Sequence, residues 1–219
     1  MFSILSAAVA PGIALLSYFY LKDKYEAEPV GMVLRTFVFG ALLVFPAMVI
    51  EYAFQQEGIM QMPWAQSFLL SGLLEEFLKW FVLFYAVYQH VEFNERYDGI
   101  VYGVSVSLGF ATVENIFYLF AFGIHEAFYR ALLPVSSHAL FGVIMGYYLG
   151  KAKFSAQPVQ ARLIGFSFLF VALLHGVYDY ILSEFNHWLY IMVPFMLYLW
   201  WTSLRKVKLA HLEQQKSGF

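Results

Sequence analysis

Residues 71–80, SGLLEEFLKW, place three ionisable side chains inside an apolar stretch long enough to cross a bilayer. The three are Glu75, Glu76 and Lys79. An ionised residue near mid-membrane costs roughly 2.5–3.5 kcal/mol even on the gentler insertion scales. Either a function depends on these groups, or they form an ion pair that only holds helices together. We favour function, and the polar residues elsewhere in the chain bear on that choice.

The composition is that of an integral membrane protein. Apolar residues make up 61% of the 219 and charged residues 13%, against roughly 45–50% and 25% in soluble domains. A net charge of -2 without basic tracts argues against nucleic-acid partners, and the absence of cysteine excludes disulfides and cysteine-based zinc sites. We expect a single domain, 1–219, in which residues 205–219 form a basic cytoplasmic tail with a frayed end.

Seven apolar stretches approach the roughly twenty residues that a membrane span requires, which predicts an all-α, polytopic membrane helix bundle. They cover residues 1–21, 32–53, 65–88, 99–121, 131–150, 162–182 and 186–204. Of the thirteen Lys and Arg residues, Lys79 is intramembrane, only Arg130 falls on one side, and all others fall on the opposite side. Because positive residues favour the cytoplasmic face, we expect the N-terminus outside and the C-terminus in the cytoplasm.

Small residues recur every four positions along the fourth and fifth stretches, a spacing that lets helix backbones approach closely in lipid. The two stripes are Gly99, Gly103, Ser107 and Ala111, and Gly142, Gly146 and Gly150. One further step takes the first stripe to Asn115, beside Glu114. One step back takes the second stripe to His138. We therefore expect the fourth and fifth stretches to make close helix contacts along these stripes, and the stripes to lead to Glu114, Asn115 and His138.

Four stretches carry ionisable groups well inside their apolar runs. Besides the three in residues 71–80, these groups are Glu114, His138, His175 and Asp179. Asp179 follows His175 by four residues, and Lys79 follows the two glutamates by four and three, so each set shares a helix face. At about 1.5 Å per residue, five of them lie about 5–15 Å from the predicted outer ends of their spans, namely Glu75, Glu114, His138, His175 and Asp179. We expect one polar chamber, reached from the outer face.

These residue types suit hydrolysis in a partly dry pocket. One carboxylate of the pair can stay ionised beside Lys79 and activate a water, while a protonated partner donates to the leaving group. His138 and His175 could stabilise the oxyanion, with Asp179 orienting His175. No cofactor is assumed, but a divalent metal such as zinc is an alternative, with a glutamate left as the base. Its ligands would come from Glu75, Glu76, Glu114, His138, His175 and Asp179.

Other polar residues carry weaker signals. Ser136 and Ser137 beside His138 suggest a serine nucleophile, but no Gly-x-Ser-x-Gly motif is present. We expect these hydroxyls to bond to the backbone of their own helix. Ionisable residues at span ends and in loops are expected to be solvated; they are Glu51, His90, Glu92, Glu95, Asp98 and His125.

Four ordered motifs, together with residues 11–23, resemble the PrsW family over nearly the whole chain. The motifs are Glu75-Glu76-Phe77-Leu78-Lys79, Glu114-Asn115-Ile116-Phe117-Tyr118, Ser137-His138-Ala139-Leu140-Phe141-Gly142 and His175-Gly176-Val177-Tyr178-Asp179. The resemblance implies a multi-pass protease of the bacterial cell membrane. Such a protease makes the first, extracytoplasmic cut in a single-span membrane-bound anti-sigma factor and so leads to release of a stress sigma factor.

The resemblance also bears on the site residues. It agrees with catalytic roles for Glu75, Glu76, His138 and His175, supported by Lys79, Glu114, Asn115 and Asp179. The family is distantly similar to the CAAX prenyl endopeptidases and the bacteriocin-immunity membrane proteases. In that wider group an arginine lies four residues after the second glutamate. Here Lys79 lies three residues after Glu76 instead. Glu114 stands four residues after Phe110, where the wider group has a histidine, so this histidine's role falls to His138 or is altered.

Two other classes of function are possible for such a chain. In an ion- or proton-coupled transporter, the intramembrane Glu, Lys and His residues would carry ions. In a non-catalytic scaffold, the polar pocket would bind partner helices. Neither paired half-length helices nor an inverted repeat is visible in the sequence, which disfavours the transporter. We therefore predict a membrane-embedded endopeptidase.

Overall fold

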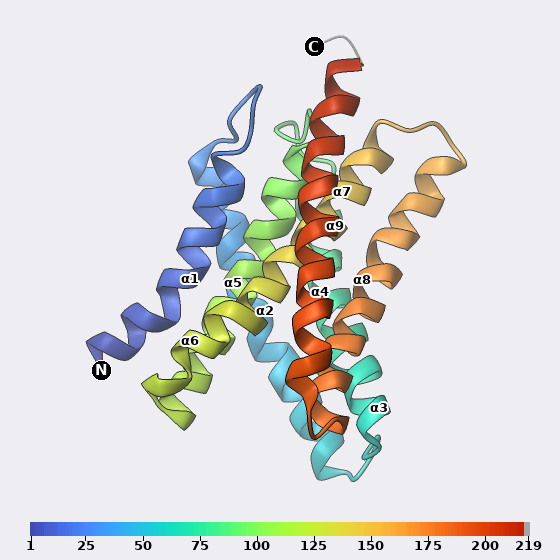
Figure 1. Cartoon of the computed structure of the whole chain (residues 1–219). Helices are drawn as coiled ribbons and strands as arrows, with labels where there is room; N and C mark the ends of the chain where they lie inside the picture. Colours follow the sequence, from blue (N-terminus) through green and yellow to red (C-terminus); the bar gives the residue numbers. More distant parts are fainter. Residues whose placement is uncertain (217–219) are drawn as a thin grey trace.

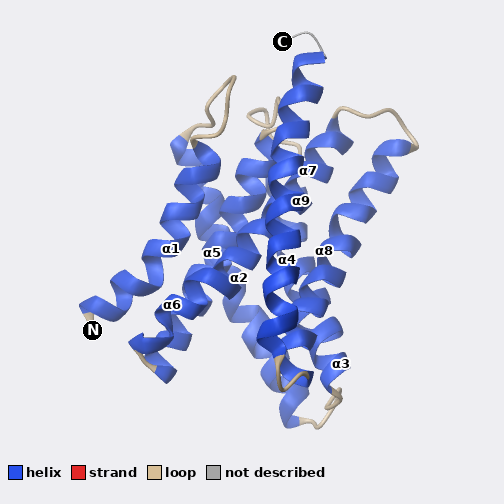
Figure 2. Ribbon diagram, in the orientation of Figure 1, coloured by secondary structure: helices blue, strands red, loops and turns tan. Residues whose placement is uncertain are grey.

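Helix α5 (Asp98–Phe122) is the centre of an all-helical bundle (Figure 1). The computed structural model describes residues 1–216, and every residue from 97 to 112 is buried. Helices α1, α2 and α7 pack around α5. No strand occurs within residues 1–216 (Figure 2). The prediction of an all-α fold is confirmed.

The remaining elements are helical throughout, and three short π-helical turns and one 3₁₀ turn interrupt them. In chain order they are α1 (Phe2–Tyr20), α2 (Val30–Gln56), α3 (Pro63–Ala65), π-helical η1 (Gln66–Glu75), α4 (Glu76–Val82), π-helical η2 (Leu83–Val87), 3₁₀ η3 (Ile124–Glu126), α6 (Ala127–Arg130), π-helical η4 (Ala131–Val135), α7 (Ser136–Lys153), α8 (Val159–Glu184) and α9 (Trp188–Lys216). The stretch that carries the paired glutamates is thus a composite of α and π turns.

Five stretches among the described residues are long and apolar enough to cross a membrane. They are Phe2–Tyr20, Val30–Gln56, Asp98–Phe122, Ile124–Lys153 and Val159–Glu184. The predicted span 65–88 does not qualify because it is divided among short segments and carries three charges. The predicted span 186–204 belongs to α9, which mixes aromatic and polar residues with its aliphatic ones. The count of seven spans stays a prediction.

Two regions that the sequence predicts as a link or a frayed end are helical. The predicted link 122–130 is mostly helix, because Gly123, at φ 102°, ends α5 and the 3₁₀ turn follows at once. The expectation of a frayed end is wrong for residues 205–216, which continue α9. Val207 and Ala210 are buried there, and the His211 ring stacks on Tyr97 at a centroid distance of 4.5 Å. Residues 217–219 lie outside the described residues.

Helices α5 and α7 meet along the two stripes of small residues. A Cβ atom on Gly103 would collide with the carbonyl oxygen of Gly142, and one on Gly146 with that of Gly99. Backbones at this separation leave no room for larger side chains. The contact leads to Glu114 and His138, whose side chains lie 3.1 Å apart. The predicted convergence is confirmed.

A second close contact joins η1 to α8. A Cβ atom on Gly72 would lie 2.6 Å from the carbonyl oxygen of Ala172 and 2.9 Å from the amide nitrogen of Gly176. Gly176 in turn leaves room for the ring of Phe68. Since Gly176 follows His175 and Gly72 precedes the glutamate pair, this contact brings the first and fourth motifs of the site together. π-Helical turns of this kind often occur at functional sites.

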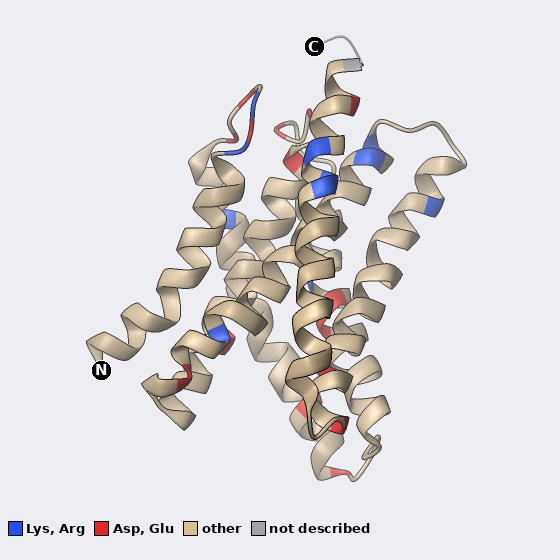
Figure 3. Ribbon diagram, in the orientation of Figure 1, with Lys and Arg blue, Asp and Glu red and all other residues tan. Residues whose placement is uncertain are grey.

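The charged residues are segregated along the bundle (Figure 3). Lys and Arg gather at the end that holds the link 21–29, the link after α7 and the C-terminal part of α9. The opposite end holds η3, α6 and the turn between α8 and α9, with few positive charges. This distribution has the asymmetry from which the orientation was predicted. The orientation in the membrane stays a prediction.

Single-cysteine labelling checks that orientation, because the natural chain has no cysteine. Ser183→Cys, at the exposed end of α8, is expected to react with a membrane-impermeant maleimide in intact cells. Gln157→Cys, exposed in the link between α7 and α8, is expected to react only after lysis. The opposite labelling pattern would contradict the predicted orientation.

Candidate active site

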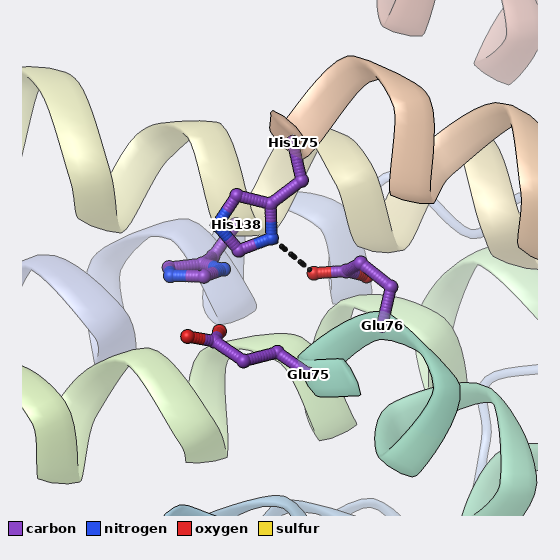
Figure 4. A group of neighbouring side chains, drawn as sticks. All are labelled: Glu75, Glu76, His138 and His175. Atoms are coloured by element: carbon purple, nitrogen blue, oxygen red, sulfur yellow. Dashed lines mark hydrogen bonds and ion pairs between the residues drawn. The ribbon is translucent and has the colours of Figure 1, made fainter. Parts of the chain in front are cut away.

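Two glutamates and two histidines meet where η1 ends, α4 begins and α7 and α8 pass (Figure 4). Glu75 closes η1 and Glu76 opens α4, while His138 belongs to α7 and His175 to α8. Each side chain offers one nitrogen or oxygen, and these atoms all lie within 4.8 Å of one another. The structure therefore brings together the four residues that the sequence predicts as catalytic.

Lys79 lies at the centre of this group. Its Nζ donates to Glu76 Oε1 at 2.7 Å, to Glu75 Oε2 at 3.2 Å and to His138 Nδ1 at 3.2 Å. The Lys79 side chain is fully buried, and its Nζ lies 4.1 Å from the centroid of the Phe110 ring. A buried ammonium is tolerated only with such partners. Lys79 therefore compensates the charge of the glutamate pair.

His175 is held from two sides. Its Nδ1 lies 2.9 Å from Glu76 Oε1, and its Nε2 lies 3.6 Å from Asp179 Oδ2 (Figure 4 shows the first of these). The ring also stacks on Phe141 with a centroid distance of 5.2 Å. These three contacts fix the orientation of the imidazole, in agreement with the predicted role of Asp179.

The contacts of His138 define its tautomer. An ammonium can only donate, so Nδ1 of His138 accepts from Lys79 and carries no proton in this arrangement. The proton is therefore on Nε2, which lies 3.1 Å from Glu114 Oε2 and donates to it. Glu114 thus orients His138 as Asp179 orients His175.

Arg130 is a member of the site that the sequence did not predict. Its Nη2 donates to Glu114 Oε1 at 2.8 Å and its Nε to Asn115 Oδ1 at 2.7 Å. Asn115 in turn donates to the carbonyl oxygen of Ala8 at 2.9 Å, which connects the site to α1. Arg130 is only 8% exposed. The one available signal was its position as the only cation on the predicted outer side.

A cavity of about 610 Å³ lies against this cluster. Glu75, His138 and His175 line it, whereas the fully buried Glu76 and Lys79 lie behind its wall. Its other lining residues include Glu114, Asp179, Tyr118, Arg130, Glu126, Tyr129, Trp188 and Leu189. Glu126 and Trp188 belong to the end of the bundle with few positive charges. The predicted polar chamber is confirmed, and it reaches that end.

Three further polar residues clarify the chemistry. Ser137 donates to the carbonyl oxygen of Pro134 at 2.9 Å, and Ser136 donates to that of Leu132, so both bond to the backbone as predicted. Glu51 was expected to be solvated, and this expectation is wrong for one of its carboxylate oxygens, Oε1. This atom is shielded from solvent, and the carboxylate interacts electrostatically with Glu75 and Glu114. Glu51 thus contributes to the electrostatics of the site.

The donor set also fits a divalent metal. Two imidazoles and two carboxylates are ligands that zinc uses in proteins, and Oε2 of Glu76 is buried with no donor among the described residues. His138 Nδ1, which now accepts from Lys79, can bind either the ammonium or a metal ion but not both. Lys79 would therefore have to release His138 before its Nδ1 could act as a ligand.

Comparison with known proteins bears on this arrangement. Residues 28–202 match the model of a family described as PrsW family intramembrane metalloprotease. The chain is 59% identical over 210 residues to "Protease PrsW" of Bacillus subtilis (strain 168), with 96% of each chain covered. It is 62% identical to that of Geobacillus kaustophilus (strain HTA426), with 96% of this chain and 93% of the relative covered.

A more distant relative is 31% identical over 226 residues, the "Protease PrsW" of Clostridioides difficile (strain 630), with 97% of this chain and 92% of the relative covered. No solved structure matches the chain. The matches favour a peptidase over the transporter and the scaffold. The chain belongs to the PrsW family of intramembrane proteases and is a multi-pass peptidase of the bacterial membrane.

Proposed function

We propose that this peptidase makes the first, extracytoplasmic cut in a single-span membrane-bound anti-sigma factor, which leads to release of a stress sigma factor. The observation that carries the proposal is the position of Glu75, which faces a cavity reaching the end of the bundle with few positive charges. With the positive end in the cytoplasm, that cavity opens on the outer side. The resemblance of the four motifs supports the class of substrate.

The lining of the cavity suits an extended peptide segment. Its lining includes the polar side chains of Glu75 and His175, together with the exposed apolar and aromatic side chains of Tyr129 and Leu189. Pockets that combine apolar contact area with a few oriented polar groups are typical of ligand sites. A segment leaving the outer end of a substrate's membrane helix would meet both kinds of side chain in this cavity.

In the proposed reaction Glu75 acts as general base. A water in the cavity gives a proton to the Glu75 carboxylate while its oxygen attacks the carbonyl carbon of the scissile peptide. Glu75 then returns the proton to the amide nitrogen as the C–N bond breaks, so that a carboxylic acid and an amine leave. Glu76 lies behind the wall of the cavity, and its bonds to Lys79 and His175 keep the charges around Glu75 fixed.

The two histidines would stabilise negative charge on the carbonyl oxygen, for which His138 would have to turn its Nε2–H from Glu114 to the substrate. Both line the cavity beside Glu75, and their rings lie at right angles with centroids 5.1 Å apart. Donors held in place before the reaction stabilise an oxyanion best, because no reorganisation is needed. Asp179 provides that positioning for His175, and Arg130 holds Glu114 beside His138.

A divalent metal remains part of the proposal. Glu75, Glu76, His138 and His175 would hold it, with Glu114 and Asp179 beside them. When bound, such an ion would polarise the carbonyl and acidify a water. One carboxylate of the pair would still be needed to carry the proton.

Co-expression with a candidate anti-sigma factor tests the proposed function. The substrate carries different tags at its two ends, and the fragments are separated into soluble and membrane fractions. The wild-type protein is expected to leave the cytoplasmic tag on a membrane-bound fragment that includes the membrane helix. Glu75→Gln should leave the substrate whole, and Glu57→Gln, an exposed glutamate outside the cavity, should cleave it normally. A cut on the cytoplasmic side, or equal cleavage without the peptidase, would contradict the proposal.

A further inference from the structure

A second group of carboxylates belongs to the link between α1 and α2 and to the start of α5, which lie at the end of the bundle opposite α6 (Figure 1). It consists of Asp23 and Glu28, in the link between α1 and α2, and Asp98, the first residue of α5. Each offers one oxygen, and the three oxygens lie within 4.8 Å of one another. We call these three residues the acidic cluster.

Two of the three residues of the acidic cluster are buried, and Asp23 is partly buried. From the sequence, Asp98 and the neighbouring Glu95 were expected to be solvated, which is wrong for both. Asp98 is fully buried, and Glu28 and Glu95 are each only 4% exposed. Both neighbouring links bond to the start of α5, because Tyr102 of α5 donates to Glu28 and Asp98 accepts from the amides of residues 94 and 95.

No basic side chain compensates these carboxylates. Among the ion pairs of the described residues, none includes Asp23, Glu28, Glu95 or Asp98. Lys153 interacts electrostatically with Asp98, but its ammonium donates to the carbonyl oxygens of residues 88 and 90. A buried charge without a partner is costly. The acidic cluster therefore lacks a counterion of its own.

Neutral donors hold two of these carboxylates in place. Asp98 Oδ2 accepts from the amides of Asn94, at 2.7 Å, and Glu95, at 2.5 Å. The hydroxyl of Tyr102 donates to Glu28. Three oxygens remain shielded from solvent with no donor among the described residues, namely Asp23 Oδ2, Asp98 Oδ1 and Glu95 Oε2.

Glu95 gives an independent indication, because it is not one of the three clustered residues. Its buried carboxylate interacts electrostatically with Asp98 and Asp23 and has one oxygen without a donor. A fourth carboxylate, buried and without a partner for one oxygen, thus lies near the three whose oxygens are close enough to bind one cation.

We propose that the acidic cluster, with Glu95, binds one divalent cation of the kind that prefers oxygen ligands, Mg²⁺ or Ca²⁺. Carboxylate oxygens are the ligands that these ions use in proteins. The bound ion joins the link between α1 and α2 to the first turn of α5. It therefore fastens the N-terminal helix pair to the central helix, about which the active site is also built.

Thermal unfolding of the full chain in detergent tests this proposal. The protein is stripped with a chelator, dialysed and titrated with Mg²⁺ alone or Ca²⁺ alone. A saturable rise in the apparent Tm of about 5 °C is expected at a large excess of the preferred ion over its Kd. Equilibrium dialysis should find one more bound ion on the wild type than on Glu28→Gln.

Variants separate this site from the peptidase site. Glu28→Gln should lose the rise while keeping an acceptor for Tyr102, and Asp98→Asn should lose it if that variant folds. Glu26→Gln removes the same charge from an exposed position in the same link and should keep the rise. Absence of any rise and of any extra ion would overturn the proposal. So would a rise that survives Glu28→Gln and disappears in His138→Gln, because the ion would then occupy the peptidase site.

Discussion

Glu75→Gln is expected to lower kcat/KM for substrate cleavage by about 10²–10⁴-fold, because this is the usual contribution of general acid–base catalysis and the amide cannot accept the proton. The substitution keeps the size of the side chain, and Glu75 is the glutamate of the pair that lines the cavity. Binding should change little, so KM should remain close to the wild-type value. The measurement is the cleavage rate of a purified single-span substrate by the purified protein in detergent.

Two outcomes would contradict this assignment. Wild-type activity in Glu75→Gln would show that another group takes the proton. Equal loss of activity in Glu57→Gln, which removes an exposed glutamate outside the cavity, would show that the loss reflects net charge instead of the site. The same assay with and without a strong chelator would show whether cleavage needs a metal.

Lys79→Met is expected to lower the free energy of unfolding by about 3–5 kcal/mol, because it leaves buried carboxylates without their counterion. Glu76 is fully buried and lies 2.7 Å from the ammonium. In a chain of this size, the loss corresponds to a fall in apparent Tm of roughly 10 °C. Thermal unfolding in detergent, followed by tryptophan fluorescence, measures it.

A double variant shows whether the effect is electrostatic. Glu76→Gln combined with Lys79→Met removes the uncompensated charge, so it should recover at least half of the lost stability while remaining inactive. Lys208→Met makes the same replacement at an exposed position and should leave the Tm unchanged. An unaltered Tm in Lys79→Met would contradict the central role given to the lysine.

Much of the site could be predicted from the sequence, because the membrane makes polar residues conspicuous. The cost of burying charge singles out Glu75, Glu76 and Lys79, and helix periodicity pairs His175 with Asp179. The stripes of small residues predicted that α5 and α7 pack closely, and the glycine contacts confirm it. Helix geometry then predicted that the polar groups lie at similar depths in the membrane. In the structure they line one cavity, which agrees with that prediction.

Burial could not be predicted from the sequence for residues in links and at span ends, because it depends on which other segments cover them. Arg130 falls in a predicted link, and only the fold shows it reaching back to Glu114. Glu51 and Asp98 lie at predicted span ends, where solvation is the ordinary expectation, yet neighbouring segments cover them. Residues 205–216 were also difficult to predict as packed helix. Their few aliphatic residues, which hold them against the bundle, are interspersed with lysines.

The most direct test of the account locates the substrate relative to the cavity. A photoreactive phenylalanine analogue replaces Tyr129, which lines the cavity and is 59% exposed, or Tyr85, which is 66% exposed on η2 outside it. Both are introduced into Glu75→Gln so that the substrate stays whole. We predict that position 129 forms an adduct at the outer boundary of the substrate's membrane helix and that position 85 does not. An adduct at that boundary from position 85, with none from position 129, would contradict the claim that this cavity is where the peptide bond is cut.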